Sequence, residues 1–129
     1  MNTPIVIANV LTLLTFIVHT FWGDKELRVI EPSGDNHAKL EKWVMARGAF
    51  HIVSMDFLLA TIGLTLINFT GFFQDKNLIL TILSVYFLAY SVGFLVSIII
   101  SRQFPKNYLK LGQWILLLLI SVLIYLGIN

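Results

Sequence analysis

The sequence predicts an all-α, polytopic membrane protein that folds as an antiparallel four-helix transmembrane bundle. Three observations lead to this fold class. Of the 129 residues, 57% are hydrophobic and 12% are charged, whereas about 25% of the residues of an average soluble domain are charged. A transmembrane helix needs about 20 mostly apolar residues. Four stretches of about this length contain no charged residue, namely residues 1–23, 57–74, 77–101 and 111–129.

The expected spans follow these stretches in chain order. The first covers residues 4–22, and its Pro4 is tolerated because the first turn of a helix does not use that N–H group. The second, third and fourth spans cover residues 48–69, 77–101 and 109–128. The last two links are short, so consecutive helices are expected to pack antiparallel within one membrane domain that comprises the whole chain.

The link between the first two spans, residues 23–47, is longer and polar. Its EPSGD run has the composition of a turn, and Asp35 at the end of this run is suited to cap the N-terminus of a helix. The HAKLEKWVMAR run that follows is consistent with two structures. It forms either a short helix on the membrane surface or a cytosolic extension of the second span.

The distribution of basic residues predicts the orientation. Cytoplasmic loops of membrane proteins carry an excess of Lys and Arg. Lys76 lies in the second link, and the other eight basic residues lie in the first and third links: Lys25, Arg28, Lys39, Lys42, Arg47, Arg102, Lys106 and Lys110. We therefore expect a multi-pass protein of the cell inner (plasma) membrane with its N-terminus and C-terminus outside.

Composition also excludes some classes of function. The formal net charge is +2, and the scattered basic residues do not form the basic surface that binds nucleic acid. The chain has no cysteine, which excludes disulfides, thiolate metal sites and cysteine nucleophiles. The expected partners are the lipid bilayer and, in one alternative, further copies of the same chain.

Polar side chains inside the expected spans indicate a pocket. Arg47, His51 and Ser54 are spaced by four and three residues, which places them on one face of a helix. His19 lies near the cytoplasmic end of the first span, at nearly the same depth as His51. We therefore expect His51 to be the partner of His19.

Asp56 follows His51 by five residues, which is about 140° around an α-helix at about 100° per residue. It is therefore expected to face a neighbouring helix. Ionisable side chains are costly in hydrocarbon and normally face a bundle interior or a wet cavity. The sequence thus predicts a polar pocket open to the cytoplasm and lined by His19, Arg47, His51, Ser54 and Asp56, with Asp24 and Glu26 at its mouth.

Three functions remain open for this pocket. The first is an enzyme acting on a small or lipid-like molecule, with a transition metal held by His19 and His51 together with Asp56 or Glu26. A haem between the two histidines, with Arg47 beside a propionate, is a variant of this hypothesis. The second is a small oligomeric transporter or channel that uses Asp56. The third is an accessory membrane subunit.

Each hypothesis has a purely structural alternative. The two histidines can hydrogen-bond to hydroxyl groups and hold helices together. Asp56 can form a salt bridge with Arg47 or with a histidine. The charges of the GDKELR run, residues 23–28, can belong to a solvated surface whose acids and bases balance.

Two short motifs carry a resemblance to a known group. HTFWGDKE places His19 before Gly23 and two acidic residues, and GAFH places Phe50 before His51. The chain thereby resembles small uncharacterised bacterial four-helix integral membrane proteins with a DoxX-like layout, in which a Trp is expected at the position of Phe50. The resemblance implies the four-helix topology and draws attention to the two histidines. It implies no activity.

Overall fold

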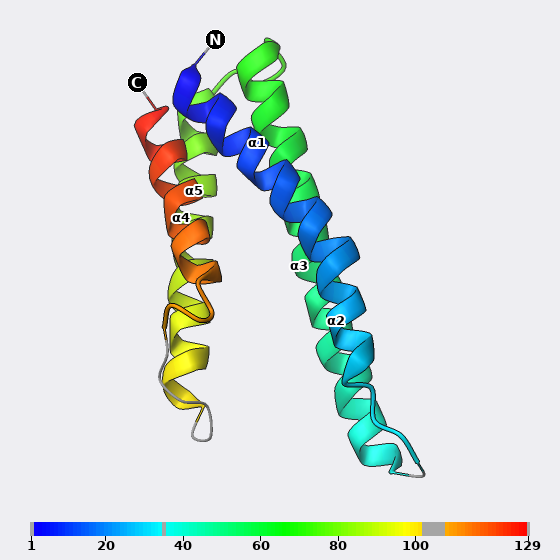
Figure 1. The fold of residues 1–129 in the computed structure, drawn as a ribbon. Coiled ribbons are helices and arrows are strands. Elements are labelled where there is room, and N and C mark those ends of the chain that lie inside the picture. The colour runs from blue at the N-terminus through cyan, green and yellow to red at the C-terminus, as the bar shows by residue number, and fades with distance from the viewer. Residues whose placement is uncertain (1, 35, 102–107, 129) are drawn as a thin grey trace. The chain divides into compact units, whose positions relative to one another are not determined.

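The structure is a computed structural model that describes residues 2–34, 36–101 and 108–128. The described residues form helices joined by turns and contain no β-strand, which confirms the all-α prediction. In chain order the elements are α1 (Thr3–Ile17), the π-helical segment η1 (Val18–Gly23), α2 (Asp24–Val29), α3 (His37–Phe69), α4 (Lys76–Ile100) and α5 (Gln113–Leu126) (Figure 1).

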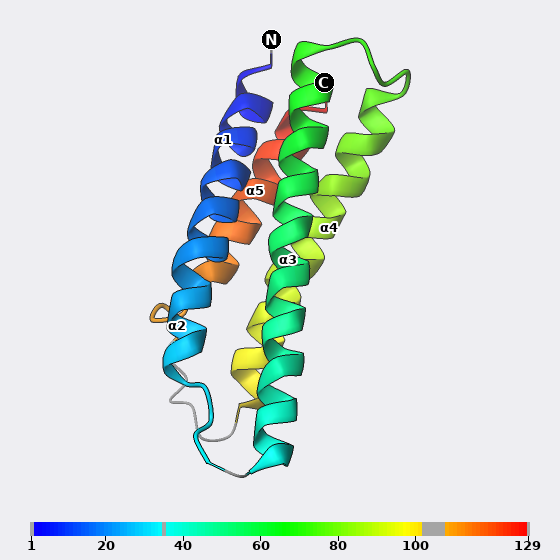
Figure 2. The same ribbon diagram turned by 90° about the vertical axis from the view of Figure 1, so that its right-hand side faces the viewer.

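The chain divides into two compact units. One unit consists of Met1–Asn9 and Leu64–Asn129, and it holds the start of α1, the end of α3, and α4 and α5. The other unit is Val10–Gly63, which holds the rest of α1, η1, α2 and most of α3. In the second unit, η1 and α2 lie beside α3 in both views (Figures 1 and 2).

The first helix continues beyond its predicted end at residue 22. α1, η1 and α2 follow one another without a break and form one helix, Thr3–Val29. Gly23 keeps helical backbone angles, with φ −64° and ψ −39°, and the Lys, Glu, Leu and Arg residues after it are good helix formers. The helix ends shortly before Pro32, because the residue that precedes a proline is biased away from the α conformation.

α3 is one helix of 33 residues, about 50 Å long at 1.5 Å per residue. Of the two structures predicted for HAKLEKWVMAR, the extension of the second span is therefore the one found. Its N-terminus is capped by Asn36, whose side-chain oxygen accepts a 3.1 Å hydrogen bond from the Lys39 backbone N–H. The predicted cap, Asp35, lies outside the described residues. Before it, the chain turns at Gly34, whose φ of 89° is in the left-handed region that favours glycine.

Among the described residues, three helices are long and apolar enough to cross a membrane: Thr3–Val29, His37–Phe69 and Lys76–Ile100. Lys76–Ile100 agrees closely with the predicted span 77–101. α5 is apolar but has only 14 residues, about 21 Å at 1.5 Å per residue. It starts after the turn at 108–112 rather than at the predicted residue 109. Arg102 and Lys106, on which the predicted orientation partly depends, lie outside the described residues.

In the unit formed by Met1–Asn9 and Leu64–Asn129, α4 and α5 pack through small polar side chains. The Ser84 hydroxyl donates to the Ser121 carbonyl oxygen over 3.0 Å, and the Ser121 hydroxyl donates to the Ser84 carbonyl oxygen over 2.7 Å. Further along α4, the Ser91 hydroxyl donates to the Trp114 carbonyl oxygen. Small residues let two helix backbones approach closely, and these hydroxyls then find acceptors without water.

Candidate functional site

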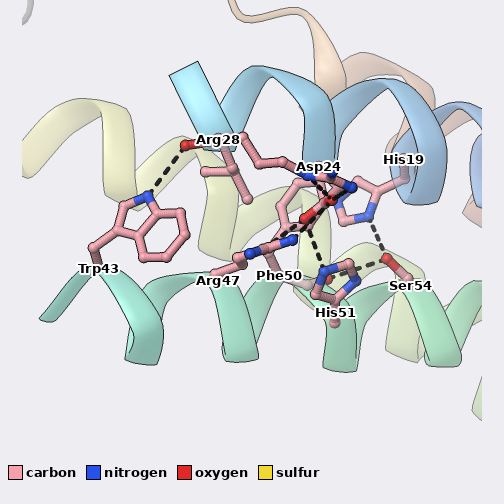
Figure 3. A network of polar contacts seen from close by, with 9 residues as sticks. His19, Asp24, Arg28, Trp43, Arg47, Phe50, His51 and Ser54 are labelled. Atoms are coloured by element: carbon pink, nitrogen blue, oxygen red, sulfur yellow. Dashed lines mark hydrogen bonds and ion pairs between the residues drawn. The ribbon is translucent and has the colours of Figure 1, made fainter. Parts of the chain in front are cut away.

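The most densely bonded polar group of the Val10–Gly63 unit is the carboxylate of Asp24. Oδ1 accepts from Arg47 Nε at 2.7 Å and contacts His51 Nε2 at 3.0 Å. Oδ2 accepts from Arg28 Nε and Nη2 at 2.8 and 2.6 Å, and from Arg47 Nη2 at 3.0 Å. We call Asp24, Arg28, Arg47 and His51 the Asp24 cluster (Figure 3).

The Asp24 cluster is polarised between an inner anion and outer cations. The Asp24 side chain is 5% exposed, whereas those of Arg28, Arg47 and His51 are 65%, 31% and 41% exposed. A buried carboxylate is costly unless it is paired and hydrogen-bonded. Here both oxygens are engaged, so the arrangement satisfies the carboxylate and leaves the basic side chains at the surface.

The neighbouring cations stabilise the ionised form of Asp24. Hydrogen bonds from Arg47, and then from Arg28, lower the pKa of the Asp24 carboxyl well below its ordinary value of 3.8. Burial acts in the opposite direction, and the contact with His51 assists the two arginines. The charge-assisted hydrogen bonds outweigh the desolvation. Asp24 is therefore a carboxylate at neutral pH.

The π-helical segment η1 explains how Asp24 reaches α3. His19 and Asp24 are five residues apart, which in a regular α-helix is a rotation of about 140°. A π-helix has i→i+5 hydrogen bonds, so residues five apart come close to the same face. Accordingly His19 contacts Ser54 and Asp24 contacts His51, and both partners lie on α3.

His19 is held by a hydroxyl and by aromatic rings. Its Nδ1 lies 2.9 Å from the Ser54 hydroxyl oxygen. Its ring stacks on Phe50, with the ring centroids 3.7 Å apart and an angle of 11° between the planes. Phe57 makes an edge contact with the same imidazole. This is the structural alternative in which a histidine bonds to a hydroxyl, and Ser54, rather than the predicted His51, is the partner of His19.

Gly23 permits the close approach of η1 to α3. A Cβ atom at this position would overlap Cζ at the tip of the Phe50 ring. The same ring stacks on His19, so a side chain at residue 23 would displace it from His19. The glycine and the aromatic residue of the two motifs that carry the resemblance are therefore in direct contact.

Trp43 on α3 forms a hydrogen bond with the C-terminal turn of α2. Its indole N–H donates over 3.1 Å to the Leu27 carbonyl oxygen, which also accepts from the Ile30 backbone N–H at the end of the helix. The Arg47 guanidinium lies 5.3 Å from the centroid of the Trp43 ring, within the range of a cation–π interaction. Trp43 thus helps to orient Arg47 toward Asp24.

The predicted face of the second span is found in the structure. Arg47, His51 and Ser54 all direct their side chains toward the first helix, the first two to Asp24 and the third to His19. Asp56 is half-buried and is not one of the contacts of Asp24. Transport through Asp56 stays a prediction.

Glu26 is exposed, and its place at the mouth of a pocket stays a prediction. The sequence also predicts Asp24 at the mouth, and the structure instead buries it. Arg47 and His51, two of the partners expected for Asp56, both contact Asp24. The GDKELR run is therefore not wholly a solvated surface.

Within the described ranges, no group of three or more His, Cys, Asp or Glu side chains is placed to hold a metal ion. The predicted ligand set His19, His51, Asp56 and Glu26 is accordingly not brought together as such a group. Metal and haem binding stay predictions.

Asp24 is the site residue whose central place sequence reasoning missed. Helical periodicity at 3.6 residues per turn does not put it on the face of His19. One signal was present, because Asp24 follows the charge-free stretch directly and is separated by four residues from Arg28, the spacing of an ion pair on a helix. The π-helical segment that directs both side chains to α3 has no comparable signal.

Compared with protein-family models, curated proteins and solved structures, the chain matches none of them. A function is therefore inferred from the geometry of the Asp24 cluster.

Proposed function

We propose that this chain is a multi-pass protein of the inner membrane, with four transmembrane helices, both termini outside and a DoxX-like layout. The three helices of membrane-crossing length support insertion. The fourth crossing would consist of α5 and the apolar residues that flank it. The concentration of Lys and Arg in the first and third links supports the orientation.

In this orientation the Asp24 cluster stands at the cytoplasmic interface. Asp24 and Arg28 follow the first spanning segment, 4–22, and Arg47 precedes the second, 48–69. Phe21 and Trp22, both strongly exposed, lie immediately before the cluster in the chain. Aromatic residues are enriched at this level of a membrane, which supports the same placement.

The function that the geometry supports best is the binding of a small, lipid-like molecule at this interface. The observation that carries it is the polarity of the Asp24 cluster, with one buried anion surrounded by the exposed Arg28 and the partly exposed Arg47 and His51. The buried carboxylate holds the basic groups in fixed positions. Fixed donors bind a ligand with less loss of side-chain entropy than free ones.

The contact between His51 and Asp24 adds a chemical capability. When Nε2 donates to Asp24, the other ring nitrogen, Nδ1, is the basic one. A carboxylate that orients an imidazole in this way is the arrangement used for proton transfer. His51 is thus the residue that would remove or supply a proton if the bound molecule reacts.

Ligand retention tests the proposed function. Native mass spectrometry of the detergent-purified protein is expected to find a bound molecule of lipid mass, and His51→Ala is expected to reduce the bound fraction. His37→Ala is the matched control, because His37 is exposed at the start of α3. An absence of bound lipid in the wild type, or equal retention by His51→Ala, contradicts the proposal.

A second experiment tests the orientation. The chain has no cysteine, so Ser33→Cys and Gly71→Cys each introduce a single thiol. The label is applied to cells whose outer membrane is permeabilised and whose inner membrane is intact. A membrane-impermeant maleimide should then label the cysteine at residue 71 and not the one at residue 33. The reverse pattern overturns the orientation, and labelling of both overturns the spans.

A further inference from the structure

We infer that the molecule bound at the Asp24 cluster is an anionic amphiphile, with its phosphate headgroup on the outward edges of Arg28 and Arg47. This inference rests on the proposed function and names the ligand class of the same site. Three features carry it: the donors that the cluster leaves unused, the charge around them and the apolar side chains that flank them.

The two guanidinium groups have donors to spare. Each arginine carries five N–H donors in a planar fork. Arg28 and Arg47 each use Nε and Nη2 on the carboxylate of Asp24, which leaves Nη1 of each without a hydrogen-bond partner in the described part of the chain. Asp24 has no comparable capacity left, because both of its oxygens already accept.

The charge around these donors favours an anion. Within the Asp24 cluster two guanidinium cations share one carboxylate. Glu31 is the other acid close enough to attract Arg47, but it is exposed, so water and salt screen it. A phosphate that accepts from two guanidinium groups makes the charge-assisted hydrogen bonds for which arginine is the preferred donor.

The flanks of the cluster point to an amphiphile rather than to a free phosphate ion. On one side in the chain, Phe21 and Trp22 are strongly exposed, and on the other side Val29 and Ile30 are strongly exposed as well. Four large apolar residues thus stand in water or lipid beside a cationic group. An acyl chain is suited to cover them while the headgroup reaches the guanidinium groups.

The experiment measures retention of defined probes by native mass spectrometry of the full chain in a neutral detergent. The probes are phosphatidylglycerol, phosphatidylcholine and inorganic phosphate, each added alone. The variants are Arg28→Gln, with Arg28→Lys as a milder change, and Glu31→Gln. Lys39→Gln is the matched control, because it removes one positive charge from an exposed position on α3. Circular dichroism confirms that each variant is helical.

The inference predicts that the wild type retains phosphatidylglycerol more strongly than phosphatidylcholine. Arg28→Gln is expected to weaken phosphatidylglycerol retention about tenfold, the effect of one charge-assisted hydrogen bond. Arg28→Lys is expected to weaken it less, because the charge remains and the fork is lost. Glu31→Gln is expected to strengthen retention, and Lys39→Gln is expected to leave it unchanged.

Three results overturn the inference and leave the proposed function in place. One is equal retention of the two lipids. Another is an Arg28→Gln variant that stays helical and keeps its preference for phosphatidylglycerol. The third is an equal loss in Arg28→Gln and Lys39→Gln, because the effect is then one of net charge and not of the site.

The remaining results distinguish a lipid headgroup from free phosphate, and they show whether the proposed function fails as well. Retention of inorganic phosphate but of neither lipid overturns the amphiphile and the proposed function, and it leaves only anion binding by the arginines. Retention of no probe and of no lipid carried from the cell overturns both proposals together.

Discussion

Polar contacts join helices in both compact units, and two of them are built from opposite kinds of groups. Ser84 and Ser121 connect α4 and α5 with neutral hydroxyls that donate to backbone carbonyl oxygens. The Asp24 cluster connects α2 and α3 with full charges. The serines lie inside charge-free stretches, whereas Asp24 lies just past the end of one.

The difference shows how the surrounding stretch of sequence governs the choice of polar group. A hydroxyl inside an apolar helix is satisfied by one carbonyl oxygen and costs little to bury when that bond forms. A carboxylate needs several donors and counter-charges, which apolar stretches do not supply. The two contacts are therefore expected to respond very differently when one partner is removed.

The largest effect is expected for Asp24→Asn. The substitution removes the carboxylate and leaves Arg28, Arg47 and His51 around a neutral amide, and partly buried charges without a counter-ion are strongly destabilising. Thermal unfolding in detergent should show a larger fall in Tm than Gly23→Ala or Ser84→Ala produces. Glu26→Gln, an acid-to-amide change at an exposed position of the same helix, is the control and should leave Tm almost unchanged.

A double variant sharpens this test. Asp24→Asn/Arg47→Gln removes one of the uncompensated cations together with the anion, so it should recover part of the Tm lost by Asp24→Asn alone. Additive losses from the two substitutions would show that Asp24 and Arg47 are not coupled.

Acid should weaken the same contact without a mutation. The folded protein holds the pKa of Asp24 below the ordinary value of 3.8, so the unfolded chain takes up this proton first. The contribution of Asp24 is then present above the unfolded pKa and is lost as pH falls toward the lower folded pKa. Tm should fall as the pH is lowered below about 4, and Asp24→Asn should show a smaller fall over the same range.

A smaller effect is expected for Gly23→Ala. The new methyl group overlaps the Phe50 ring, and overpacking of this kind typically costs about 1–3 kcal/mol. Gly48→Ala is the matched control, since a Cβ there meets no atom. Chemical unfolding should separate the two variants, and Gly23→Ala/Phe50→Leu should regain stability. Equal effects of the two alanines would contradict the close packing of η1 against α3.

The smallest effect is expected in the serine contact. Ser84→Ala removes one hydroxyl from the pair, and hydrogen bonds between membrane helices are worth about 0.6 kcal/mol on average. Ser97→Ala is the control, because the Ser97 hydroxyl donates to Gly93 of its own helix. A double-mutant cycle of Ser84 and Ser121 measures the coupling directly. A loss as large as that of Asp24→Asn would remove the contrast between the two contacts.

Several features follow from local sequence and are confirmed. Absence of charge and high hydropathy predict helices that overlap the observed ones. In a long apolar run without helix breakers, an α-helix is the simplest way to pair the backbone N–H and C=O groups. The shared face of Arg47, His51 and Ser54 is confirmed because α3 is a regular helix there, where residues three and four apart are neighbours.

The remaining features depend on tertiary structure. The sequence by itself determined the helical class, the apolar stretches and the one face of α3, since each rests on composition or on regular periodicity. Only the tertiary structure decided that Asp24 is the centre of the site and that Ser54 is the partner of His19. The physical reason is the π-helical turn at Val18–Gly23, which changes the helical phase and brings Gly23 against the ring of Phe50 on α3.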